Sequence, residues 1–85
     1  MKIQCYEETF DVPDFIIGKY LKDFDCLPGS GNRESVLQLR NAVDEVLDIA
    51  EYDPEILEEP AYLCDFIKAL AIQQAMRKLG ILHDA

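Results

Sequence analysis

One histidine and three cysteines are the residues of this sequence best suited to nucleophilic chemistry or metal binding. A hydrolytic nucleophile needs an adjacent base, and His83 lies in a C-terminal tail, 83–85, that we expect to fray. Cys5, Cys26 and Cys64 form no Cys-x-x-Cys pair, whereas structural zinc sites use paired Cys and His ligands. We expect no catalytic residue, no cofactor and no metal, and a protein that is not an enzyme; catalysis by carboxylates or Cys26 is the least favoured alternative.

The cysteine pattern favours a cytoplasmic protein with reduced thiols. An odd number of scattered cysteines does not indicate a disulfide framework. A reactive thiolate needs positive charge nearby, and the chain has eight Lys and Arg against seventeen Asp and Glu. We expect three buried thiols, with Cys26, in the loop before Leu27-Pro28-Gly29, the one most prone to exposure.

Two other local patterns invite a ligand but fail their motifs. Gly29-Ser30-Gly31 is followed by Asn32-Arg33-Glu34, not by the Gly-Lys-Ser/Thr ending of a P-loop, so a connection between helices is favoured. The acids of 44–48 follow a helical pattern and lack the alternating ligands and central glycine of an EF-hand.

The formal net charge of −9 bears on the class of partner. Such a charge opposes binding to nucleic acid or to an anionic membrane and favours a basic protein. The longest charge-free apolar run, 69–76, is far shorter than the ~20 residues of a membrane span. No secretory signal pattern follows Met1, so the cytoplasm is the expected location.

The acidity is concentrated in residues 44–59, which we call the acidic segment. It contains no Lys, Arg or His, and its acids are Asp44, Glu45, Asp48, Glu51, Asp53, Glu55, Glu58 and Glu59. Charge runs are usually solvated faces that keep a protein soluble. The alternative is a docking surface for a basic partner, or, at the extreme, a mimic of nucleic-acid phosphates that blocks a DNA- or RNA-binding protein.

A helix predicted over 61–79 has apolar residues on two sides. Leu63, Phe66, Ile67 and Leu70 share one side at ~100° per residue, and Ile72, Ala75, Met76 and Leu79, joined by Ala69, lie nearly opposite. The second side is a possible oligomer face, used in a homodimer. Alternatively, this helix is the central one, covered by the other elements.

The remaining pattern predicts a short hairpin over 2–12 followed by helices. Alternation in Ile3 and Cys5, then Phe10 and Val12, surrounds a polar break at Glu7-Glu8-Thr9. Helices are expected at about 13–24 and 33–51, with a helical turn near 54–57. The expected boundary residues are Pro13 in the first turn of the first helix, Asn32 and Asp53 as N-caps, Pro54 at a first helical position and Gly80 as the final C-cap.

These elements predict one α+β, mostly α domain over 1–85, with the hairpin at 2–12, the helical part at 13–82 and the tail at 83–85. The predicted core is Ile3, Phe10, Val12, Ile16, Leu21, Val36, Leu39, Val43, Val46, Leu47, Leu63, Phe66, Ile67 and Leu70.

Residues 2–24, in which Glu8-Thr9-Phe10-Asp11-Val12 leads into Ile16, Leu21 and Phe24, resemble the start of BTB/POZ-type adaptors. The hairpin-then-helices outline is also similar to phage tail-assembly chaperones, small acidic proteins that shield tail components before assembly. Both resemblances imply a protein that binds other proteins. The leading expectation is an adaptor, assembly chaperone or inhibitor that engages a basic partner, and the alternative is an assembly protein that forms a homo-oligomer.

Overall fold

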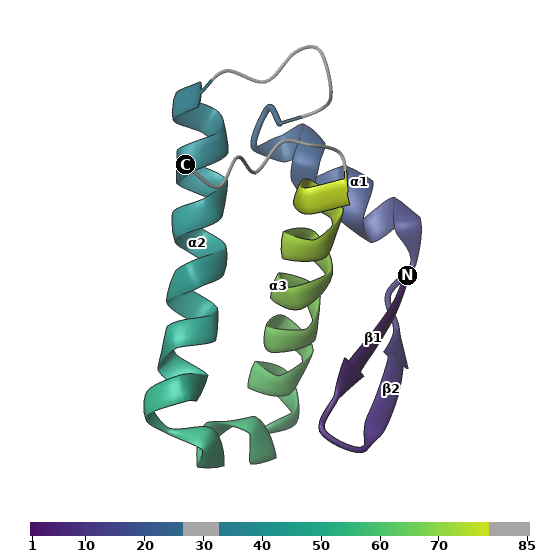
Figure 1. The fold of residues 1–85 in the computed structure, drawn as a ribbon, viewed down its shortest axis with the longest axis vertical. Helices are drawn as coiled ribbons and strands as arrows, with labels where there is room; N and C mark the ends of the chain where they lie inside the picture. The colour runs from purple at the N-terminus through teal and green to yellow at the C-terminus, as the bar shows by residue number, and fades with distance from the viewer. Residues whose placement is uncertain (27–32, 79–85) are drawn as a thin grey trace.

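The computed structural model describes residues 1–26 and 33–78, which form a two-stranded hairpin and a set of helices (Figure 1). The elements are β1 (Lys2–Cys5), β2 (Glu8–Asp11), α1 (Asp14–Asp23), α2 (Arg33–Tyr52), the 3₁₀ helix η1 (Pro54–Glu58) and α3 (Pro60–Lys78). The predicted class, a mostly α α+β fold with an N-terminal hairpin packed on three helices, is confirmed. The predicted caps Asn32 and Gly80 and the predicted tail lie outside the described residues.

The hairpin is antiparallel, with Ile3 opposite Phe10 and Cys5 opposite Glu8. Ile3 and Cys5 are buried while their strand neighbours are exposed, as the alternation predicted. The predicted break was misplaced, because Glu8 and Thr9 belong to β2 and the loop consists of Tyr6 and Glu7. Tyr6 makes this tight loop possible by adopting a positive φ of 56°, a conformation rare for a bulky residue.

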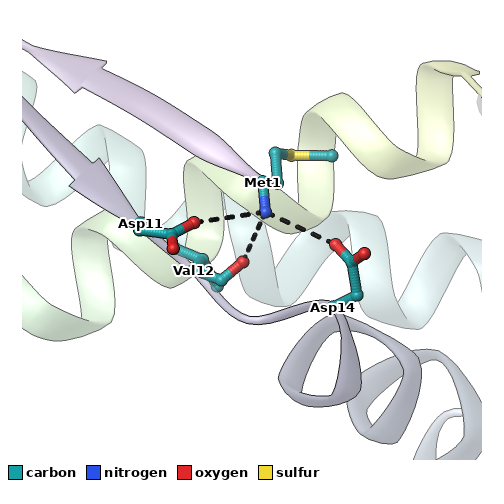
Figure 2. A network of polar contacts seen from close by, with 4 residues as sticks. All are labelled: Met1, Asp11, Val12 and Asp14. Atoms are coloured by element: carbon teal, nitrogen blue, oxygen red, sulfur yellow. Dashed lines mark hydrogen bonds and ion pairs between the residues drawn. The ribbon is translucent and has the colours of Figure 1, made fainter.

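The Met1 ammonium joins the hairpin to the start of α1 (Figure 2). It donates a hydrogen bond to the Val12 carbonyl at 2.7 Å, and the Val12 N–H donates to the Met1 carbonyl at 2.7 Å. The ammonium also lies 3.5 Å from an Asp11 oxygen and 3.4 Å from an Asp14 oxygen. Asp14 thus contacts the ammonium from the first turn of α1, where a negative charge also suits the helix dipole.

Helix α1 ends in a Schellman motif that explains the position of Cys26. The Asp25 N–H donates to the Lys22 carbonyl and the Cys26 N–H to the Leu21 carbonyl, while Asp25 has a φ of 56°. This motif brings the residue after the left-handed one against the last turn of the helix. Cys26 is therefore buried, with 1% of its surface exposed, and the prediction that it is the most exposed thiol was wrong.

Helices α2 and α3 are joined by η1 into a helical hairpin (Figure 1). Pro54 occupies the first turn of η1, as predicted, because proline lacks the N–H that would be left without a helical partner there. Asp53 occupies the N-cap position, but its side chain makes no capping hydrogen bond. The predicted N-cap position of Asp53 is therefore confirmed, although its side chain does not cap the helix.

Helix α3 is the central element, since it contacts α2, η1, α1 and β1. Every predicted core residue is buried or packs against the buried cluster. The cluster also includes Cys5, Ile17, Cys26, Ala69, Ala71, Ile72, Ala75 and Met76. No helix in the described ranges is long and apolar enough to span a membrane.

Candidate protein-binding surface

The acidic segment follows the second half of α2, crosses η1 and ends where α3 begins. Asp44, Glu45, Asp48 and Glu51 lie on α2, Asp53 at the joint, Glu55 and Glu58 on η1, and Glu59 directly before α3. All eight side chains are exposed except Asp44, which is half-buried. The backbone positions of these acids therefore follow the second half of α2 and the end of the molecule that η1 closes (Figure 1).

Very little positive charge balances these carboxylates. Asp44 forms an ion pair with Arg40 on the same helix, at 3.9 Å between Oδ2 and Nε. Exposed pairs of this kind stabilise a helix by only ~0.3–0.5 kcal/mol. The other seven acids of the segment have no salt-bridge partner within residues 1–26 and 33–78.

Glu51 lies in the last turn of α2, where negative charge is least favourable. A helix C-terminus carries partial negative charge, so an acid there costs ~0.3–1 kcal/mol when exposed at low salt. The last turn of α2 has no basic residue. Glu58 and Glu59 directly precede α3 and its positive end, and Asp53 occupies the N-cap position of η1, so the fold accounts for these three acids but not for Glu51.

Two exposed apolar side chains lie within the acidic segment and were not singled out in the sequence. Tyr52, between Glu51 and Asp53, is 90% exposed, and Ile49, one turn earlier, is 42% exposed. Tyrosine is enriched at protein interfaces because its ring buries a large area while its hydroxyl keeps a polar partner. In the sequence, Tyr52 stands directly after the predicted helix 33–51 and before Asp53 and Pro54, so it was assigned only to the break between two helices.

A hydrogen bond fixes the position of α3 against the acidic part of α2. The Tyr62 hydroxyl donates to the Val46 carbonyl. Desolvation raises the pKa of the Tyr62 phenol, and the carboxylates of Asp65 and Glu45 raise it further. Glu45 lies on α2 and Asp65 on α3, so acids of both helices raise the pKa of this phenol.

The possible oligomer face predicted on α3 is not a free surface of this chain. Ile72, Ala75 and Met76 are 4%, 6% and 0% exposed, and Leu79 lies outside the described residues. A contact between copies through these three side chains would require the core to open. The alternative, in which this helix is covered by the other elements, agrees with the observed burial.

The thiols divide into two buried groups and one exposed group. Burial raises the pKa values of Cys5 and Cys26, and the nearby carboxylates of Glu8 and Asp25, respectively, raise them further. Cys64 is exposed on α3, so the expectation of three buried thiols was wrong for this residue. Within the described residues, no three or more His, Cys, Asp or Glu side chains are grouped to hold a metal ion.

Comparison of the chain with protein-family models, curated proteins and solved structures finds no match. The resemblances of residues 2–24 to BTB/POZ adaptors, and of the outline to phage tail-assembly chaperones, stay predictions.

Proposed function

We propose that this chain is a small, non-enzymatic protein-binding module of the cytoplasm, acting as an adaptor, assembly chaperone or inhibitor. It engages a basic partner through the acidic segment, residues 44–59. The nucleic-acid mimic is the special case in which that partner is itself a DNA- or RNA-binding protein.

The observation that carries the proposal is the arrangement of Glu51, Tyr52 and Asp53. Glu51 is held at the unfavourable end of α2, and next to it, between Glu51 and Asp53, the side chain of Tyr52 is 90% exposed. Folding gains nothing from either feature. A partner would gain from both, because a basic side chain neutralises the acids and an arginine can also stack on the ring.

The partner chemistry follows from the charges that surround this ring. Arginine pairs with carboxylates through two parallel hydrogen bonds, which gives orientation as well as attraction. The remaining acids of the segment, spread over α2 and η1, add long-range attraction that speeds the encounter and is screened by salt. A basic helix or loop rich in arginine therefore fits this surface best.

The test is salt-graded affinity capture from the native host, followed by binding measurements on charge-matched variants. Asp48→Asn, Glu51→Gln and Asp53→Asn together should weaken the captured complex at least tenfold. The control removes three acids elsewhere by Glu7→Gln, Asp23→Asn and Asp25→Asn, all at exposed positions, and should retain most of the affinity.

Two outcomes would contradict the proposal. A complex whose affinity is indifferent to ionic strength is not held by the acidic segment. Equal losses in both triple variants would show that only the total charge matters. Competition by DNA for the captured partner would identify the mimic form.

A further inference from the structure

A mainly apolar pocket lies between α1, α2 and α3. It adjoins the acidic segment, because Val46 lines it, but none of the eight acids of that segment does. Leu39 and Ile72 in its lining are buried, and the half-buried side chains of Tyr20, on α1, and Phe24, directly after α1, also line it. Ala42 on α2 also lines the pocket and is exposed. The pocket therefore meets the solvent beside Ala42 of α2.

The size of the pocket restricts what it can hold. Its volume is about 250 Å³. Pockets for small-molecule ligands usually measure ~300–1,000 Å³, whereas a cavity of ~150 Å³ already accepts benzene. The space therefore fits a single aromatic side chain better than a cofactor or a drug-sized ligand.

The mouth of the pocket adjoins the acidic part of the surface. Val46 and Asp65 both line the pocket, and Val46 directly follows Glu45. The hydrogen bond from Tyr62 to the Val46 carbonyl holds these two walls together. Asp65, which is exposed, brings a carboxylate to the lining of the pocket.

Lys68 is the basic residue that lines the pocket, and it raises the question of a negatively charged ligand. Its single charge is opposed by Asp65 in the same lining, and by the neighbouring acidic segment, to which Val46 belongs, in a chain of net charge −9. The summed field at the entrance therefore favours a cation over an anion.

We propose that this pocket receives one aromatic side chain of a basic partner segment, whose cationic group lies near Asp65. The choice of a basic partner rests on the proposed function. The pocket itself does not depend on that function, since its apolar walls are formed by other residues than the acids of the acidic segment. Such a ring, seated beside salt-sensitive charge contacts, would supply the buried anchor that most protein interfaces need.

The test uses three probes with the same ring and different charges: tryptamine, indole and indole-3-propionate. Titrations followed by amide chemical shifts of the ¹⁵N-labelled full chain should show weak binding, on the order of millimolar, by tryptamine and indole. The largest shifts should fall on residues lining the pocket. Tryptamine should bind about two- to fivefold more tightly than indole, as expected for one exposed charge pair.

Matched variants locate the binding. Ala42→Phe fills the mouth from an exposed helical position and should weaken both probes at least tenfold, while Ala61→Phe, the same change at an exposed position of α3 away from the pocket, should not. Asp65→Asn should make tryptamine and indole bind equally. If Ala42→Phe does not fold, the shift map of the unmodified chain still decides whether the ring enters this pocket.

Three results would overturn the inference: no binding of indole or tryptamine, shifts that fall elsewhere, or binding that survives Ala42→Phe in a folded protein. Tightest binding of indole-3-propionate, abolished by Lys68→Gln, would assign the pocket to an anionic ligand instead. Indole is neutral, so its binding should be insensitive to salt. If indole still binds while the triple variant Asp48→Asn, Glu51→Gln and Asp53→Asn leaves the affinity for the captured partner unchanged, the proposed function is rejected and the pocket is retained.

Discussion

The Tyr62 hydroxyl, in the first turn of α3, donates a hydrogen bond to the backbone carbonyl of Val46 on α2. Sixteen residues separate the two, and the bond links the helical hairpin where the acidic segment and the apolar pocket meet. Variants at this contact can therefore measure the stability of the fold separately from binding at its surface.

Tyr62→Phe should lower the free energy of unfolding by ~0.5–1.5 kcal/mol, the usual net value of one hydrogen bond. The Val46 carbonyl lies within α2 and keeps its helical partner, so the loss should fall in the lower half of that range. Urea denaturation measures it. Tyr52→Phe is the control, because Tyr52 is 90% exposed and its hydroxyl should contribute nothing to stability. An equal loss in both variants would refute the role assigned to Tyr62.

Glu51→Gln should stabilise the fold by ~0.3–1 kcal/mol at low salt, because it removes a negative charge from the C-terminal turn of α2. Glu58→Gln should be neutral or slightly destabilising, since Glu58 precedes the positive end of α3. Thermal unfolding at low and high salt distinguishes the two. If Glu51→Gln destabilises the chain, the argument that folding does not favour this acid fails.

The fold was largely predictable because its elements depend on local patterns. Alternation around Ile3 and the helical spacing of Val36, Leu39 and Val43 require no knowledge of distant contacts. The loop of the hairpin was misplaced because Tyr6 is a typical strand residue that here adopts a positive φ. Cys26 was misjudged for a related reason: Asp25, not glycine, occupies the left-handed position that ends α1.

The site was less predictable than the fold. The sequence located the acids of 44–59. It could not distinguish an acid that a helix N-terminus favours, such as Glu58, from Glu51, which lies at a helix C-terminus. That difference depends on where α2 ends and α3 begins. The sequence also did not decide whether Ile72 and Met76 are buried within this chain, because their side of α3 could be covered by this chain or by another.

Alkaline pH should destabilise the chain through its buried thiols. Burial raises the folded-state pKa of Cys5 and Cys26 above the ordinary value of 9.0, so the unfolded chain loses these protons first. The unfolded state then binds fewer protons than the folded state, and the free energy of unfolding falls as pH rises. The stabilisation is complete below pH 9 and is lost as pH passes through the raised values.

Urea denaturation between pH 8 and 10 measures this slope. Cys26→Ala should reduce it, although removal of a buried side chain also lowers stability at every pH. Cys64→Ala, at an exposed position, is the control and should leave the slope unchanged. A flat profile in the unmodified chain would contradict the effect; Tyr62 adds to it only at higher pH, since its pKa is raised from 10.0.

Thiol labelling should distinguish Cys64 from the other two cysteines. In the folded chain a disulfide reagent such as 5,5′-dithiobis(2-nitrobenzoate) should react rapidly with one thiol, because Cys64 is exposed while Cys5 and Cys26 are buried. Cys26 is further held by the Schellman motif and by a hydrogen bond from its Sγ to the Phe24 carbonyl at 3.3 Å. All three thiols should react in denaturant. Cys64→Ser should remove the fast phase, whereas Cys26→Ser should leave it intact; a fast phase lost with Cys26 would mean that the end of α1 opens in solution.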